Sequence, residues 1–296
     1  MKRSSMVQTS HAPIRVEQAG NGDKVVLLIH GNSMSLEVFA EQMAVLPTRG
    51  YRVVAFDLPG HGGSGNATDP ARSYTLPGYA DLAKELLALL GIADPVILGW
   101  SLGGHIALEM MAYTPLARGL VLVGTPPVGM HDFRQAFRPS PHMRLVAQRR
   151  WSSADIEQVA QMFGKALPPS LRQSLVRADG LARTILFEGR DAGLGVDQRR
   201  LVERLPTPVA IINGADDPMI NLDYLDAVGF GNLWGGRCVR IPGAGHAPFL
   251  ETPAVFNAIL DAFLDDLGAA TEWSGSSRRC RTTPARTATR LQTRGR

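Results

Sequence analysis

The chain has 296 residues, of which 45% are apolar and 20% charged, and its formal net charge is +4. That apolar fraction excludes a disordered or fibrous protein and allows one large globular domain or two small ones. No apolar run approaches the roughly 20 residues that span a bilayer, and no apolar stretch follows the basic start, so we expect a cytoplasmic protein without a membrane span. The two cysteines, Cys238 and Cys280, do not indicate a disulfide framework.

The positive charge is concentrated at the C-terminus. Residues 268–296 hold seven arginines and one acidic residue, Glu272, which gives this segment +6 and leaves residues 1–267 at −2. The segment is rich in Ser, Thr and Gly, and it lacks interleaved aromatic residues and helical periodicity. We therefore expect a basic, disordered tail and no nucleic-acid partner.

Short apolar runs alternate with amphipathic stretches along residues 1–127. Buried strands are expected at residues 25–29, 52–56, 96–98 and 120–123, and helices at 36–46, 76–90 and 102–112. This alternation is typical of a mostly parallel sheet flanked by helices on both faces. The predicted fold class is therefore α/β, with residues 1–127 as the first part of the core.

Residues 128–205 lack a strand pattern. They are helix-like, are interrupted by prolines and carry many large apolar side chains, which predicts an inserted helical cap. Strands are expected again at 209–212 and 238–241, followed by a helix from Pro253 to about Leu267. Residues 206–267 would then complete the core.

A nucleophile motif stands between the strand at 96–98 and the helix at 102–112. The run GWSLGG, residues 99–104, places Ser101 at a strand-to-helix turn with glycines where strand and helix must approach closely. The hydroxyl would project from the carboxyl edge of the sheet, beside the N-terminus of a helix that favours a developing oxyanion. This context predicts that Ser101 is a catalytic nucleophile.

A serine nucleophile needs a histidine base and a carboxylate that orients the histidine. His246 lies in the loop GAGHAPF after the last expected strand, over the same sheet edge, and it is the predicted base. Asp217 in NGADDP is the predicted acid, and the neighbouring Asp216 is interpreted as a solvated turn residue. Of the other histidines, His105 is expected to pack on the helix behind Ser101.

The oxyanion hole requires two N–H donors. Leu102 would supply one from the helix N-terminus, and Asn32, in the loop after the first expected strand, would supply the other. The amide side chain of Asn32 could add a hydrogen bond to the substrate. The apolar content of the cap suits an acyl chain, and the residues predicted to bind substrate are Asn32, Trp100, Val159, Met162 and Phe163.

Taken together, His30-Gly31, DLPGHGGSG, GWSLGG, NGADDP and GAGHAPF resemble the α/β-hydrolase fold family over residues 14–267. More narrowly, HGNSMSLEVF, GWSLGGHIALEMMA, GTPPV and FGNLWGG are similar to the serine-dependent N-acyl-homoserine lactone hydrolases of that fold. The resemblance implies quorum-quenching lactonase activity with Ser101, Asp217 and His246 as the triad. Members of that family can carry Glu at the position of Asp217.

The expected function is hydrolysis of a small-molecule ester or lactone through an acyl-enzyme on Ser101. No metal is expected, because no H-x-H-x-D-H cluster is present, and no dinucleotide cofactor, because no G-x-G-x-x-G follows the first strand. Two alternatives stay open at this point: a generic carboxylesterase of acyl or aryl esters, and a small-molecule receptor of the same fold with little turnover. The sequence leaves the oligomeric state open.

Overall fold

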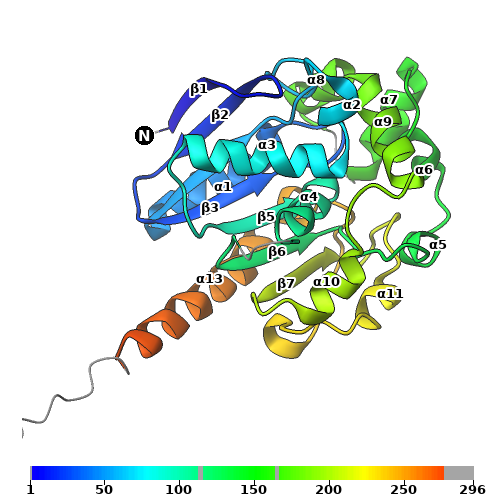
Figure 1. Ribbon diagram of the computed structural model, residues 1–296. Helices are drawn as coiled ribbons and strands as arrows, with labels where there is room; N and C mark the ends of the chain where they lie inside the picture. The colour runs from blue at the N-terminus through cyan, green and yellow to red at the C-terminus, as the bar shows by residue number, and fades with distance from the viewer. Residues whose placement is uncertain (1, 113–115, 164–166, 277–296) are drawn as a thin grey trace, which may run out of the picture.

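A computed structural model describes residues 2–112, 116–163 and 167–276, with side chains described up to residue 269. Within these residues an eight-stranded sheet forms the centre of the molecule, in the order β1-β2-β4-β3-β5-β6-β7-β8 (Figure 1). The strands are β1 (Lys2–Gln8), β2 (Pro13–Ala19), β3 (Lys24–Ile29), β4 (Tyr51–Phe56), β5 (Val96–Trp100), β6 (Gly119–Val123), β7 (Val209–Gly214) and β8 (Val239–Ile241).

Strands β3 to β8 pair in parallel, whereas β1 pairs antiparallel with β2 and β2 antiparallel with β4. The parallel pairing brings the carboxyl ends of β3, β5, β6 and β7 to one edge of the sheet. The hairpin of β1 and β2 was missing from the sequence prediction, because β1 is mostly exposed and shows no apolar run. In β2, Ile14 and Val16 are fully buried, and Glu17 and Ala19 are nearly so.

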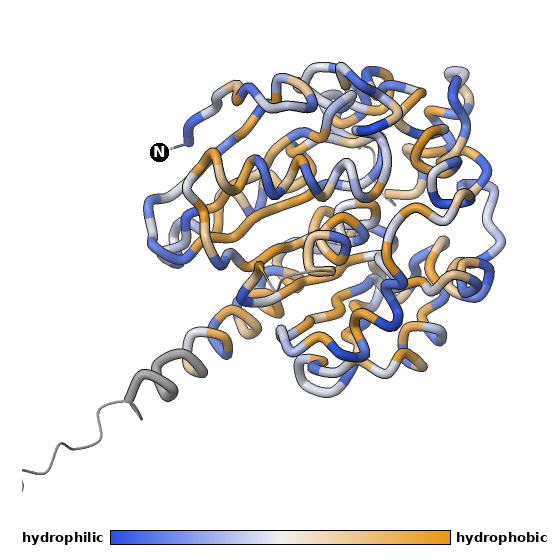
Figure 2. Tube along the Cα trace, in the orientation of Figure 1, coloured by the Kyte–Doolittle hydropathy of each residue, from blue (hydrophilic) through white to orange (hydrophobic). Residues whose placement is uncertain are grey.

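The side chains of the central strands alternate between two hydrophobic layers. Leu27 and Ile29 pack with helices α3, α4 and α10, while Val26 and Leu28 pack with α1, α12 and α13 on the opposite face. Figure 2 shows these central strands as the most hydrophobic part of the chain. The helices are α1 (Ala40–Val45), α2 (Pro70–Ser73), α3 (Leu76–Leu89), α4 (Leu102–Met110), α10 (Gln198–Arg204), α11 (Leu222–Asp226), α12 (Pro248–Glu251) and α13 (Pro253–Ser276), with single 3-10 turns at Leu36–Phe39, Leu46–Arg49 and Trp234–Gly236.

The described part of the segment between β6 and β7 contains short helices joined by loops and no strand. Its elements before α10 are α5 (Phe133–Ala136), α6 (Pro141–Leu145), α7 (Ser153–Ala160), a 3-10 turn at Gln161–Phe163, α8 (Pro169–Arg177) and α9 (Gly180–Asp191). Figure 1 shows α5 to α9 beyond the carboxyl edge of the sheet, while α10 packs on α4 in the layer that covers the sheet. The division of the chain into core and cap at residues 127 and 205 stays a prediction.

The C-terminal helix is longer than the sequence indicated. We expected α13 to end near Leu267 and a disordered tail to begin at residue 268, but the helix continues through Ser276. The arginine-rich residues 277–296, with Cys280, lie outside the described residues. In the part of the chain that is described, no helix is both long and apolar enough to cross a bilayer.

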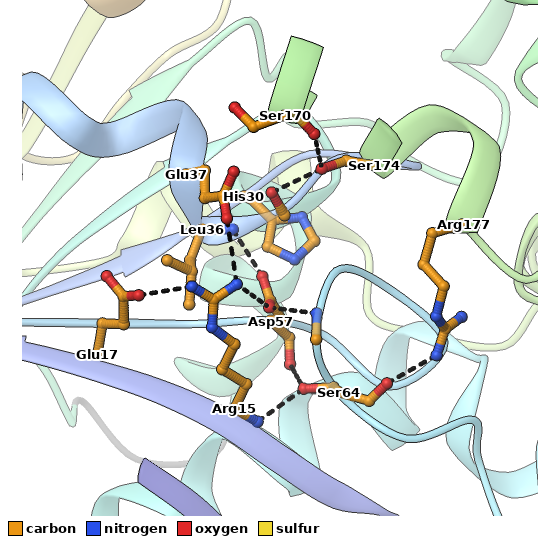
Figure 3. Close-up of polar contacts among 12 residues, drawn as sticks. Arg15, Glu17, His30, Leu36, Glu37, Asp57, Ser64, Ser170, Ser174 and Arg177 are labelled. Atoms are coloured by element: carbon orange, nitrogen blue, oxygen red, sulfur yellow. Dashed lines mark hydrogen bonds and ion pairs between the residues drawn. The ribbon is translucent and has the colours of Figure 1, made fainter. Parts of the chain in front are cut away.

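A buried ionic cluster ties the N-terminal hairpin to the loops around the sheet edge (Figure 3). The Arg15 guanidinium on β2 lies 2.6 Å from Glu17, 3.2 Å from Glu37 and 3.6 Å from the fully buried Asp57 after β4. Asp57 also accepts hydrogen bonds from the N–H groups of Leu36 and Gly63, each at 2.7 Å. This carboxylate therefore fixes two loops at the edge.

Candidate active site

Ser101 occupies a strained turn between β5 and α4. Its backbone has φ 53° and ψ −116°, a conformation that non-glycine residues adopt only when their surroundings impose it. A Cβ atom on Gly99 would lie 2.5 Å from the carbonyl oxygen of Gly103, and one on Gly103 would collide with the backbone of Ile29. The close approach of strand, helix and neighbouring strand thus accounts for the glycines around Ser101.

Asp217 and His246 form a buried pair at the same edge. His246 Nδ1 lies 2.8 Å from Asp217 Oδ2, and Asp217 Oδ1 accepts hydrogen bonds from the N–H groups of Met219 and Ile220 at 2.8 and 3.1 Å. Burial raises the pKa of Asp217, but the His246 ring and the two backbone donors outweigh it, so that the pKa lies below its ordinary value. Asp217 is therefore held as a carboxylate.

The carboxylate also sets the tautomer of His246. An ionised Asp217 can only accept, so His246 Nδ1 carries the proton and Nε2 is left as the basic nitrogen. Asp216, in contrast, is exposed, and its described contact is a backbone hydrogen bond from its N–H to Ala244. Of the two adjacent acids, only Asp217 meets the histidine.

Ser101 and His246 line one cavity, although the described contacts include no hydrogen bond between the serine hydroxyl and the imidazole. Such bonds are often long before substrate binds. The His246 ring is confined by Gly124, which has φ +58° and where a Cβ atom would lie 2.7 Å from Cε1 of the imidazole. The residue that faces the ring at the end of β6 must therefore be glycine.

Two further residues hold the His246 loop, and the sequence analysis did not assign them this role. The Glu251 carboxylate accepts hydrogen bonds from the N–H groups of Gly245 at 2.8 Å and Ala247 at 2.9 Å, one on each side of His246. Trp100 Nε1 donates to the His246 carbonyl oxygen at 2.9 Å. An acid five residues after a loop histidine, in the short helix that follows the loop, is the signal that could have indicated Glu251.

The two predicted oxyanion donors lie at the edge beside Ser101. Within the described residues, neither the Asn32 nor the Leu102 N–H donates a hydrogen bond, so both are available to a ligand. The Asn32 side chain donates one Nδ2 hydrogen to the Val146 carbonyl at 3.0 Å, and its Oδ1 accepts from Ser33. Because Nδ2 has a second hydrogen and Asn32 lines both cavities, its hydrogen bond to the substrate stays a prediction. This amide ties the loop after β3 to the helical segment above it.

Two cavities meet at Ser101. The larger, of about 110 Å³, has a mostly apolar lining to which α5, α6 and α9 contribute. The smaller, of about 40 Å³, lies beside His246. Asn32, Ser101, Val146 and Met219 line both, so a single ligand could occupy both cavities across the serine.

All the residues predicted to bind substrate line the smaller cavity: Asn32, Trp100, Val159, Met162 and Phe163. The apolar side chains of the larger cavity were not singled out as substrate-binding, because apolar residues on a short helix serve packing and ligand binding equally well. They include Phe133, Phe137, Met143, Leu186 and Phe187. Among the described residues, no group of three or more His, Cys, Asp or Glu side chains could hold a metal ion.

Comparison with known proteins agrees with this architecture. The model of the alpha/beta hydrolase family matches residues 26–259. The pimeloyl-[acyl-carrier protein] methyl ester esterase of Aromatoleum aromaticum is 31% identical over 247 residues, covering 77% of this chain and 93% of that protein. The enzyme of the same name from Neisseria meningitidis serogroup A is 30% identical over 296 residues, covering 91% and 88%.

Solved structures include a more similar protein. The N-acyl homoserine lactonase AidH, complexed with N-butanoyl homoserine, is 45% identical, with a TM-score of 0.87 and coverage of 90% of this chain and 97% of that one. A serine-to-glycine mutant of AidH, complexed with N-hexanoyl homoserine lactone, is 44% identical with the same TM-score. The resemblance to such lactonases that the motifs predicted is therefore confirmed, and the chain belongs to the alpha/beta hydrolase family.

Proposed function

We propose that this hydrolase opens the lactone ring of N-acyl-homoserine lactones through an acyl-enzyme on Ser101. The observation that carries the proposal is the meeting of two cavities at Ser101, one apolar and one beside His246. The larger suits an acyl chain, and the smaller suits the compact ring whose ester is attacked. The 45% identity to a lactonase complexed with N-butanoyl homoserine supports the same substrate class.

In the proposed first step, Ser101 Oγ attacks the ring carbonyl carbon while His246 Nε2 takes the hydroxyl proton. Asp217 stabilises the resulting imidazolium, and the N–H groups of Leu102 and Asn32 bind the oxyanion. The tetrahedral intermediate then collapses: the bond to the ring oxygen breaks, and that oxygen takes the proton from His246. The product of this step is an acyl-enzyme that carries a free hydroxyl on the same molecule.

Water completes the reaction. His246 Nε2 removes a proton from a water molecule, which attacks the acyl carbonyl, and the protonated imidazole returns the proton to Ser101 Oγ. One water is consumed, one carboxylate appears, and the product is N-acyl-homoserine. Every proton transfer uses the same imidazole nitrogen, which is the one that Asp217 leaves unprotonated.

A carboxylesterase of acyl or aryl esters is the second candidate. Two relatives of 30% and 31% identity carry the name of a methyl ester esterase, and an apolar cavity beside Ser101 would also take the acyl part of such a substrate. A ligand receptor of the same fold would bind with little turnover.

Turnover of matched substrates by the purified full chain separates these candidates. We expect rapid multiple turnover of N-hexanoyl-homoserine lactone and slower cleavage of p-nitrophenyl hexanoate, which shares the acyl group. Rapid cleavage of the phenyl ester with intact lactone would support the esterase instead. Binding of the lactone with at most one turnover per protein molecule would support a receptor.

A further inference from the structure

His105 faces the larger cavity, although the sequence suggested that it packs behind Ser101. It lies on α4 one helical turn after Ser101, and its N–H donates to the Ser101 carbonyl at 3.2 Å. The residue lines the cavity together with Phe137, and the centroids of the two rings are 6.4 Å apart. Ser101 lines the same cavity, so the imidazole and the serine hydroxyl face one ligand space.

Gln198 fixes which imidazole nitrogen of His105 carries the proton. Gln198 Nε2 donates to the His105 carbonyl at 3.2 Å, so the other end of the amide, Oε1, faces His105 Nδ1 at 2.7 Å. An amide oxygen only accepts, so Nδ1 must donate. Burial lowers the pKa of His105, which keeps the ring neutral, and Nε2 is therefore a lone-pair acceptor.

Nothing in the described residues uses that acceptor. No hydrogen bond reaches His105 Nε2, and the atom is not among the buried polar atoms that lack a partner, so it stays accessible. The other polar side chains of the cavity offer little competition. Arg190 can only donate, and Asn32 Oδ1 already accepts from Ser33.

An acceptor inside an apolar cavity favours a ligand that brings a donor to the same place. An amide N–H that enters such a cavity without a partner loses its hydrogen bonds to water, at a cost of a few kcal/mol. In an N-acyl-homoserine lactone, the amide nitrogen is two bonds from the carbonyl carbon that Ser101 would attack. A substrate held at Ser101 therefore brings this N–H into the cavity that His105 also lines.

We propose that His105 Nε2 accepts a hydrogen bond from the amide N–H of N-acylated lactones, which makes His105 a specificity-determining residue. The inference rests on the proposed lactonase function and deepens it. Esters without an N–H group near the reacting carbonyl leave this acceptor unpaired. His105 thus selects N-acylated substrates over simple esters of equal length, and Gln198 acts through it as a positioning residue.

The test uses two lactones that differ at one atom. N-hexanoyl-homoserine lactone is compared with its analogue in which a CH₂ group replaces the N–H. Both molecules keep the same ring ester, and opening of that ring is the reaction measured. For the unmodified protein we expect kcat/KM to favour the amide about tenfold or more, as for loss of one buried hydrogen bond. The ratio of kcat/KM for the amide to kcat/KM for the CH₂ analogue is the quantity compared between variants. In His105→Phe, which keeps a ring but has no acceptor, this ratio should fall close to one, because only turnover of the amide becomes slower.

Two further variants keep the test decisive. Gln198→Leu retains the imidazole but frees its tautomer, so its ratio should lie between those of the unmodified protein and His105→Phe. Leu186→Met changes another side chain of the cavity without changing its polarity and should leave the ratio unaltered. An unchanged ratio in either folded His105 or Gln198 variant overturns the inference, whereas failure of the unmodified protein to open either lactone overturns the proposed function itself.

Discussion

The carboxyl edge of the sheet and the helices beyond it differ in the kind of side chain that they contribute to the site. At the edge, buried carboxylates hold the site in place: Asp217 contacts His246, Glu251 holds the loop around it, and Asp57 holds the loop that carries Asn32. In the segment between β6 and β7, short helices contribute apolar side chains that together form the wall of a cavity. We infer that the edge sets the chemistry, and the helical segment sets the substrate.

This difference leads to distinct expectations for mutations. Loss of one polar group at the edge leaves its buried partner without a hydrogen bond, or removes a group that stabilises the charge developing in the transition state, and either loss is costly. Loss of one apolar side chain among the helices removes part of a surface that several others share. Edge substitutions should therefore act on kcat for every substrate, and cavity substitutions should act on kcat/KM according to acyl length.

The largest effect is expected for Ser101→Ala. Removal of the hydroxyl should lower kcat by about 10³-fold or more for every ester tested, because no other group can form the acyl-enzyme. The alanine side chain should leave the thermal midpoint nearly unchanged, since the described contacts include no hydrogen bond of the serine hydroxyl. Kinetics and a melting curve check both, and near-normal turnover by the folded variant would contradict the assignment.

The next effect separates the adjacent acids. Asp217→Asn should lower kcat by about 10² to 10⁴-fold, because an amide can stabilise the wrong imidazole tautomer and cannot balance its charge. The matched Asp216→Asn should change kcat by less than about twofold, since Asp216 is exposed and does not contact the imidazole. The two variants are assayed side by side. A larger loss of kcat in Asp216→Asn than in Asp217→Asn would show that Asp216 is the acid that orients His246.

A smaller effect concerns the larger cavity. Lengthening the acyl chain from butanoyl to hexanoyl should raise kcat/KM by up to about fourfold for each buried CH₂, from roughly 0.8 kcal/mol each. Leu186→Phe narrows that cavity and should remove most of the gain, while kcat for the butanoyl substrate stays nearly constant. Equal chain-length dependence in both proteins would place the acyl chain elsewhere, such as against Val159 and Phe163 in the smaller cavity.

The smallest effect is on stability and involves buried histidines that do not contact the substrate cavities. Burial lowers the pKa of His30 to about 3 and that of His61 to about 4, whereas the ordinary pKa of histidine is 6.5. Below pH 6.5 both histidines are therefore protonated in the unfolded chain while they stay neutral in the folded chain. The free energy of unfolding should fall as the pH drops from 6.5 toward 4, by about 1 kcal/mol per pH unit for each histidine. Burial raises the pKa of Asp57 from its ordinary value of 3.8 to about 6. Between these two pH values Asp57 has the opposite effect, because its protonation raises the free energy of unfolding as the pH drops.

Urea unfolding at two pH values checks this balance. Between about pH 7 and pH 5, His61→Asn should lose about 1–2 kcal/mol less stability than the unmodified protein. His131→Asn is the matched control, because His131 lies outside the buried core. If the free energy of unfolding changed equally with pH in all three proteins, His61 would not be held neutral in the folded chain, and this prediction would be wrong.

The edge could be predicted from the sequence because its chemistry depends on local backbone geometry. Glycines around Ser101 and in the His246 loop mark turns where only small residues fit, and strand ends place those turns at one edge. The proximity of Asp217 and His246 follows from chain order in a parallel sheet. Their spatial pairing matches the prediction, while their catalytic roles stay part of the proposed function.

Other features depend on tertiary packing that no local pattern reveals. The exposed strand β1 has no apolar run, and α13 continues past Leu267 through residues whose composition resembled a tail. The bond from Asn32 to Val146 joins residues that are far apart in sequence, as does the bond from His105 to Gln198. Which apolar side chains line a cavity depends on how the helices pack, so Phe137 and Leu186 could not be separated from core residues beforehand.

The identity of the reaction product tests the central claim most directly. Mass spectrometry of N-hexanoyl-homoserine lactone incubated with the purified chain should show N-hexanoyl-homoserine, heavier by one water, with one new carboxylate. Attack on the ring ester is expected because an ester carbonyl is more electrophilic than an amide and because the ring oxygen can accept the proton from His246. Release of hexanoic acid and free homoserine lactone would instead show cleavage of the amide, and it would contradict the account.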